Sequence, residues 1–375
     1  MTVRIINADV MDGLRQLPDE SVHCVVTSPP YWGLRSYLPD DHPLKPLEIG
    51  SEPTLQEHIA KLVEVFEEVR RVLRKDGTLW LNYGDMWWNG DKWGGGGSNS
   101  GKHVRTGNGE VPSWAVRRKR APSPGLKPKD LCMVPHRLAI ALQDAGWWVR
   151  SDIIWSKPNP MPESVTDRPT KAHEYVFLLT KSARYFYDAE AIKEYAEYGF
   201  PNAPASIASP HGQGYTRRAS AVSDSARIPG TAPQTGMRRQ TSRIGSKGNA
   251  RGFRGGSYVG GQPGPRSEQG NTTNETLSRN KRSVWTIATV PYPEAHYATF
   301  PPELPEICIK AGCPAGGTVL DPFGGSGTTG LVADRLQRSA ILIDLNPDNI
   351  PMAERRIGAD RGPLLDAMEI GAPDV

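Results

Sequence analysis

The chain has 375 residues, carries a formal net charge of +4 at pH 7 and is 37% hydrophobic. This length allows one large domain or two ordinary ones, and the charge is too small to identify a partner. No signal sequence and no apolar run of membrane-spanning length is visible, and the four cysteines lack the spacing of metal ligands. We therefore expect a soluble cytoplasmic protein that has no membrane segment, no disulfide framework and no bound metal.

The first 85 residues alternate between predicted strands and helices. The apolar pattern predicts strands over residues 4–7 and 22–27 and a helix over residues 10–17. A second helix opens at Thr54, because Thr54 and Glu57 have the spacing of a capping box. Its apolar residues keep a 3.6-residue period, Gly77 ends it, and a strand follows over residues 78–83.

The same rhythm returns after residue 130, where a helix is predicted from Pro135 onward. The apolar segments that follow are predicted as strands at 147–149, 153–155, 175–179, 318–321 and 341–343. A last helix is predicted over residues 347–357. This alternation predicts an α/β fold with a mainly parallel sheet that helices cover on both faces.

Two stretches, residues 86–130 and 196–283, interrupt the rhythm. Between residues 211 and 283, thirteen Lys and Arg residues face only three Asp and Glu residues. One interpretation is a flexible, solvated insertion, and the other is a segment that binds a polyanion and becomes ordered on contact with it. The charge ratio favours the second interpretation. The candidate nucleic-acid contacts are Arg117, Arg118, Lys119, Arg120, Arg238, Arg239, Arg243, Arg251 and Arg254.

A glycine-rich loop follows the predicted strand at 318–321. Residues 325–330 have the spacing G-x-G-x-x-G at a predicted helix start, and Asp344 ends the next strand, where a carboxylate can accept hydrogen bonds from ribose hydroxyls. The pattern alone also fits an NAD-binding fold. A phosphate-binding P-loop is excluded, because no Gly-Lys-Ser/Thr follows.

Two further features separate these nucleotide alternatives. Only 31 residues follow Asp344, too few for the strands that a dinucleotide fold still needs, so we expect the N-terminal segments to complete the sheet. Asp321 and Phe323 stand beside the glycines, and a carboxylate there suits a sulfonium and an amino group better than it suits a pyrophosphate. We therefore expect S-adenosylmethionine as the cofactor.

The loop after the predicted strand at 22–27 indicates the chemistry. In Ser28-Pro29-Pro30-Tyr31 the prolines have a fixed φ and no N–H, so the loop presents carbonyl acceptors without competing donors. The Ser28 hydroxyl and a proline carbonyl can accept both hydrogens of an NH₂ group, which helps to localise the nitrogen lone pair for attack on a methyl group. Tyr31 offers a ring on which a planar base can stack.

Segments 27–32 and 321–327 together resemble the motifs of the exocyclic-amino DNA methyltransferases, in the β arrangement in which the catalytic motif precedes the cofactor motif. Segments 155–162, 173–175, 185–188 and 296–301 resemble further blocks of that family. The resemblance covers roughly 1–85, 131–190 and 284–357. It implies a Rossmann-like methyltransferase sheet with a permuted motif order, formed by residues 1–195 and 284–375, with 86–130 and 196–283 as basic, Gly-rich insertions.

The resemblance also implies roles for individual residues. The catalytic residues would be Ser28, Pro29, Pro30 and Tyr31. The cofactor site would consist of Asp9, Phe300, Asp321, Phe323, Gly324, Gly325, Ser326, Gly327 and Asp344. In this family a base flipped out of the duplex receives the methyl group directly on nitrogen. The Pro-Cys loop of C5-cytosine enzymes is absent from this sequence.

Several alternatives for the substrate remain open. Ser28 favours N4 of cytosine, because Asp is commoner at this position in the adenine enzymes of the family, and N6 of adenine is the alternative. Methylation of RNA or of a protein glutamine is one rival, and a DNA-binding protein without catalysis is another. The Arg-rich insertion and the motif blocks of duplex enzymes argue against the first rival, and the two undamaged loops argue against the second. We expect double-stranded DNA as the substrate, residues 196–283 as a target-recognition or disordered region, and a cognate restriction endonuclease as a candidate partner.

Overall fold

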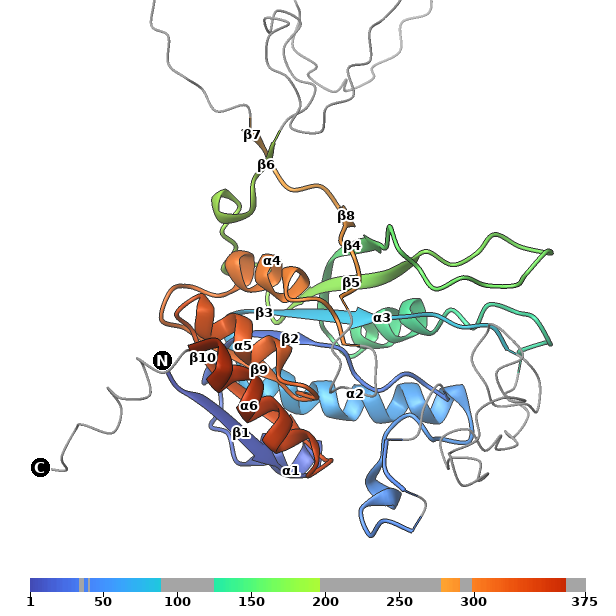
Figure 1. Cartoon of the computed structure of the whole chain (residues 1–375), viewed down its shortest axis with the longest axis horizontal. Helices are drawn as coiled ribbons and strands as arrows, with labels where there is room; N and C mark the ends of the chain where they lie inside the picture. The colour runs from blue at the N-terminus through green and yellow to red at the C-terminus, as the bar shows by residue number, and fades with distance from the viewer. Residues whose placement is uncertain (34–36, 40, 89–124, 196–277, 291–298, 362–375) are drawn as a thin grey trace, which may run out of the picture. The chain divides into compact units, whose positions relative to one another are not determined.

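The computed structural model of the chain describes residues 1–33, 37–39, 41–88, 125–195, 278–290 and 299–361 (Figure 1). All of these residues except Tyr195 belong to one compact unit. Within them, no helix is long and apolar enough to cross a membrane. The candidate nucleic-acid contacts between Arg117 and Arg254 lie outside the described residues.

An eight-stranded sheet forms the centre of this unit, in the order β1-β10-β9-β2-β3-β5-β4-β8. Its strands are β1 (Val3–Asn7), β2 (Val22–Thr27), β3 (Leu73–Tyr83), β4 (Trp148–Ser156), β5 (His173–Thr180), β8 (Val284–Thr286), β9 (Thr318–Asp321) and β10 (Ser339–Asp344). All pairs of neighbours are parallel except those that β5 makes with β3 and β4. The predicted mainly parallel sheet is therefore confirmed. A separate two-stranded sheet joins β6 (Glu194–Tyr195) and β7 (Ser278–Arg279).

Helices cover both faces of the large sheet. They are α1 (Val10–Arg15), α2 (Leu55–Val72), α3 (Val134–Asp144), α4 (Glu303–Gly312), α5 (Thr328–Arg335) and α6 (Asn349–Arg361), with short 3₁₀ turns at Lys45–Leu47 and Glu190–Ile192. One core cluster joins α1, α2 and α3 to the sheet, and the other joins α4, α5 and α6 to it. Successive residues of β2 alternate between the two clusters, because Val25 packs in the first and Cys24 and Val26 in the second.

The predicted capping box at the start of α2 is present. The Thr54 hydroxyl accepts a hydrogen bond from the Glu57 backbone N–H, and the Glu57 carboxylate accepts one from the Thr54 N–H. The end of α2 differs from the prediction, because the helix stops at Val72 rather than at Gly77. Leu73 already pairs with Val22 of β2, and residues 74–77 bulge out before Thr78 pairs with Cys24.

The predicted segments 147–149 and 153–155 form one strand, β4, with a register shift between Val149 and Ser151. Strand β4 runs antiparallel to β5 because residues 157–172 connect the two strands as a hairpin. The N-terminal segments complete the sheet as expected. Strand β1 pairs with β10, and β2 lies between β9 and β3. Since β1, β2, β9 and β10 are mutually parallel, the loops after their carboxyl ends lie at one edge of the sheet, where α/β proteins bind ligands.

Candidate active site

The two predicted loops, far apart in sequence, lie side by side because β2 pairs with β9. A buried hydrogen-bond cluster joins them at the strand ends. The Asp321 carboxylate accepts hydrogen bonds from the hydroxyls of Thr27 and Thr329, both at 2.7 Å, and from the Phe323 backbone N–H at 3.1 Å. Asp321 is only 1% exposed, and this burial raises its pKa to about 6, although the hydroxyl donors act in the opposite direction.

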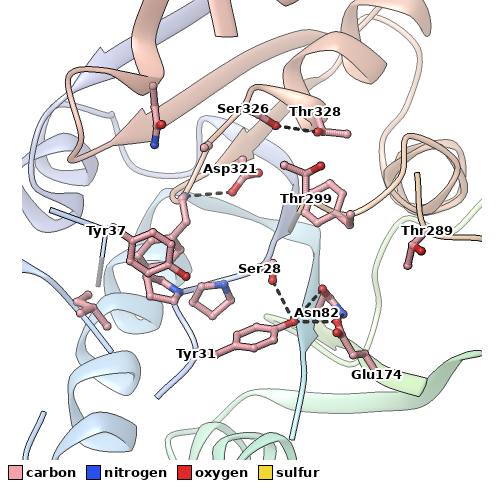
Figure 2. A pocket seen from close by; sticks show the side chains of 18 of the residues that line it. Ser28, Tyr31, Tyr37, Asn82, Glu174, Thr289, Thr299, Asp321, Ser326 and Thr328 are labelled. Atoms are coloured by element: carbon pink, nitrogen blue, oxygen red, sulfur yellow. Dashed lines mark hydrogen bonds between the residues drawn. The ribbon is translucent and has the colours of Figure 1, made fainter. Parts of the chain in front are cut away.

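A cavity of about 910 Å³ opens over these strand ends (Figure 2). Its volume is in the range of small-molecule and cofactor sites. The predicted catalytic and cofactor residues that line it are Asp9, Ser28, Pro29, Pro30, Tyr31, Phe300, Asp321, Phe323, Gly324, Gly325, Ser326 and Asp344. The fold thus brings together every site residue predicted from the two loops except Gly327.

The glycine loop is held by hydrogen bonds to Asp344. The Gly325 N–H donates to one carboxylate oxygen at 2.7 Å, and the Asn346 N–H and the Asn349 side chain donate to the other at 2.9 and 3.0 Å. Burial raises the pKa of Asp344. Gly327 is the N-cap of α5 at φ +78°, and a Cβ on it would lie 2.8 Å from the Cβ of Ala353. Gly327 therefore allows α5 and α6 to approach each other.

Arg356 of α6 is a further contact of this loop that the sequence did not indicate. Its guanidinium donates to the hydroxyls of Ser326 and Thr328, both at 2.8 Å, and to the Ser326 carbonyl at 3.2 Å. Asp9 caps α1 by accepting a hydrogen bond from the Met11 N–H at 3.0 Å. These contacts fix the glycine loop and the N-terminus of α1.

Tyr31 of the Ser28–Tyr31 loop is held from several sides (Figure 2). Its hydroxyl donates to Glu174 at 2.9 Å and accepts a long hydrogen bond, 3.4 Å, from the Ser28 hydroxyl. Its ring stacks on Tyr83 with 4.5 Å between the centroids. Burial and then the charge of Glu174 raise the pKa of the Tyr31 phenol well above its usual value, so this hydroxyl stays protonated at neutral pH.

Glu174 connects Tyr31 to two further residues that were not predicted as part of the site. It forms an ion pair with Lys157 and accepts a hydrogen bond from the Asn82 amide at 3.3 Å. Burial by itself would raise the pKa of Glu174, but the Lys157 ammonium, the charge of Lys171 and the hydrogen bond from Tyr31 together lower it. Lys157 and Glu174 lie in segments 155–162 and 173–175, which resemble blocks of the family, but the sequence did not indicate that they pair. The hairpin brings them together, since Trp155 pairs with Glu174 two residues before Lys157.

Some predictions remain without a structural test. Asp321 lines the cavity, but its oxygens already accept three hydrogen bonds from the chain, so a direct cofactor contact stays a prediction. Phe300 lines the cavity, whereas residues 291–298 are not described. Among the described residues no group of three His, Cys, Asp or Glu side chains could hold a metal ion.

Known proteins are similar to this chain in sequence and in fold. Residues 22–355 match the N6/N4 methyltransferase family, which is described as DNA methylase. The chain is 37% identical to the Type II methyltransferase M.XycI of Xanthomonas campestris pv. cyanopsidis, over 94% of this chain and 87% of the relative. It is 38% identical to the Type II methyltransferase M.SmaI of Serratia marcescens, over 94% and 90% of the two chains.

Among solved structures, the PvuII DNA methyltransferase, described as cytosine-N4-specific, has a TM-score of 0.51 at 16% identity and covers 96% of this chain and 92% of its own. This likeness concerns the fold and confirms the Rossmann-like class. The family match spans most of the chain, and the two relatives are matched over nearly their whole length. The chain belongs to the N6/N4 DNA methylases, the DNA methyltransferases that act on exocyclic amino groups.

Proposed function

We propose that this chain is a Type II DNA methyltransferase that transfers a methyl group from S-adenosylmethionine to N4 of cytosine in duplex DNA. The observation that carries the proposal is the single cavity that both the Ser28–Tyr31 loop and the glycine loop line. The relatives M.XycI and M.SmaI are Type II methyltransferases and support the class. The Ser at position 28 supports cytosine over adenine, and N6 of adenine is the alternative.

The residues around the glycine loop fit S-adenosylmethionine. Asp321 and Asp344, which end the neighbouring strands β9 and β10, both line the cavity, and two carboxylates there favour a ligand that carries positive charge. Asp344 would accept hydrogen bonds from the ribose hydroxyls, and the rings of Phe300 and Phe323 would pack on the adenine. When bound, the cofactor supplies an electrophilic methyl group on a sulfonium centre.

The catalytic loop would bind the amino group of the target base. The Ser28 hydroxyl donates its hydrogen toward Tyr31, which leaves its lone pairs to accept one hydrogen of the amino group. The Pro30 carbonyl accepts a hydrogen bond from the Tyr83 hydroxyl at 3.4 Å, so we assign the second acceptor to the Pro29 carbonyl. With the cofactor bound, the amino nitrogen would form the new N–C bond as the bond between the methyl carbon and the sulfonium sulfur breaks, which would leave a neutral thioether, and the methylated nitrogen would release one proton to solvent.

Positioning is the main contribution of the chain to this reaction. Holding two reactants in line can supply roughly 7–11 kcal/mol of a barrier. Tyr31 is held between Tyr83 and Glu174, so its ring is in place to flank a base before DNA binds. No covalent bond between the protein and the base is required.

Transfer of a labelled methyl group tests this assignment. DNA should be labelled and RNA should not, and the Ser28→Ala/Tyr31→Ala double variant should lose transfer to DNA. A matched control is Ile140→Ala, because Ile140 is an exposed residue of α3 that does not line the cavity. Unchanged transfer by the double variant would refute the site, and label in RNA would refute the substrate.

We further propose that the basic stretch at 196–283 reads the target sequence, and that a cognate restriction endonuclease accompanies the enzyme. Thirteen cations against three anions between residues 211 and 283 support contact with phosphates. Deletion of residues 205–278 should weaken DNA binding far more than cofactor binding, measured by titration of each ligand. Equal DNA affinity after the deletion would contradict this role.

A further inference from the structure

One side chain on the rim of the cavity is more exposed than its apolar character leads one to expect. Met161, in the hairpin connection between β4 and β5, is 86% exposed. The next most exposed large hydrophobic side chain in the described part of the chain, Val284, reaches 58%. Met161 and its neighbours Pro160 and Pro162 line the same cavity as Ser28 and Tyr31. The apolar Met161 side chain, the tip of this connection, is therefore exposed to solvent beside the proposed base site.

The segment between β4 and Met161 is held by hydrogen bonds to the chain after β8. Asn159 and Thr289 exchange two hydrogen bonds, because the Asn159 amide donates to the Thr289 carbonyl at 3.0 Å and the Thr289 N–H donates to Asn159 Oδ1 at 2.9 Å. Pro160 and Pro162 restrict the backbone on either side of Met161.

The segment after the tip is fixed as well. Glu163 accepts hydrogen bonds from the Arg168 guanidinium at 2.8 Å and from the Lys171 N–H at 3.0 Å. The Arg168 guanidinium also lies over the Trp87 ring, 3.2 Å from its centroid. Both flanks of Met161 are therefore held by hydrogen bonds. Little conformational entropy of the backbone would be lost when Met161 contacts a partner.

Given the proposed function, the partner at this rim is duplex DNA whose target base has entered the cavity. Flipping a base leaves a gap in the stack, and apolar side chains, Met among them, are those that proteins insert between base steps. We propose that Met161 enters the base stack at the gap that the flipped target base leaves and thereby stabilises the flipped state. This inference rests on the proposed function and adds a DNA-contacting residue outside the two motif loops.

The test compares two duplexes that carry the target site, which is first mapped by sequencing methylated DNA from an expressing host. In one duplex the target base is paired, and in the other it is mispaired and flips at lower cost. For Met161→Ala we expect methylation of the paired duplex to fall about tenfold, the effect of losing the burial of one apolar side chain. Methylation of the mispaired duplex should stay within about twofold of the wild type, because flipping there needs less stabilisation.

Three controls make the result specific. Met161→Leu should restore activity on the paired duplex, Ile140→Ala should match the wild type on both, and the affinity of Met161→Ala for S-adenosylmethionine should be unchanged. The fluorescence of a 2-aminopurine placed beside the target base should increase less on binding of Met161→Ala than on binding of the wild type. Wild-type rates for Met161→Ala, or an equal loss on both duplexes, would overturn the inference and favour a contact with another partner. If the wild type methylates no DNA, the proposed function fails and this inference fails with it.

Discussion

The Asp321→Asn substitution isolates the cost of a buried charge at the joint between the two loops. Asp321 is 1% exposed, and burial raises its pKa from 3.8 to about 6. The folded protein therefore holds a proton that the unfolded chain releases between these two pH values, so the contribution of Asp321 to stability falls as pH rises through this window. A pKa difference of about two pH units corresponds to about 3 kcal/mol once both states are ionised.

Asparagine has the same shape and no charge, so the variant should not show this loss. Integrated over the titration, about 2 kcal/mol of the effect develops between pH 4.5 and pH 7.5. Asp344 is present in both proteins, and its negative charge is one of the smaller causes that raise the pKa of Asp321, so this repulsion is part of the effect that the substitution removes. Loss of one acceptor for the Thr329 hydroxyl adds an offset that does not depend on pH.

Urea unfolding at several pH values measures the effect. The free energy of unfolding of Asp321→Asn, minus that of the wild type, should rise by about 2 kcal/mol from pH 4.5 to pH 7.5. Thr54→Ala serves as a control, since it removes a helix cap without changing a charge. A difference that stays constant or falls with rising pH would refute the argument that the buried carboxylate ionises at a cost.

Urea unfolding of four variants, among them the Thr54→Ala control, tests packing and the site. Glu174→Gln leaves Lys157 without its ion-pair partner and should lower the free energy of unfolding by about 3 kcal/mol. Adding Lys157→Met should recover at least half of this loss. If the losses of the two substitutions are additive instead, the pair is not coupled. Thr54→Ala should cost about 1 kcal/mol, and an unchanged stability would mean that the capping box contributes little. Gly327→Ala should cost about 1–3 kcal/mol because of its positive φ and the contact with Ala353, and a neutral result would contradict the close approach of α5 and α6.

The parts of the fold that the sequence predicted are those with strong local signals. The capping box at Thr54 and Glu57 fixed the start of α2, and the glycine spacing after Asp321 identified a ligand loop. The end of α2 could not be located, because the pairing of Leu73 with Val22 ends the helix before Gly77. That pairing is a contact between distant residues and leaves no periodic mark.

The same distinction applies to the site. Ser28, Tyr31 and Asp344 carry their chemistry in short motifs, and all three line the cavity. The Glu174–Lys157 pair depends on the hairpin register of β4 and β5, which no local pattern specifies. The sequence predicted the role of Asp321 only in part. Its motif identifies it as a site residue, but its three hydrogen-bond donors come from both ends of the chain, and no local pattern indicates them.

The central claim is the transfer of a methyl group to an exocyclic amino group of DNA, with cytosine as the base. Mass spectrometry of nucleosides tests it most directly, on unmethylated DNA incubated with the protein and S-adenosylmethionine. The account predicts N4-methylcytosine, and the Ser28→Ala/Tyr31→Ala variant should produce none. N6-methyladenine alone would contradict the assignment to cytosine, and DNA without any methylated amino group would contradict the account as a whole.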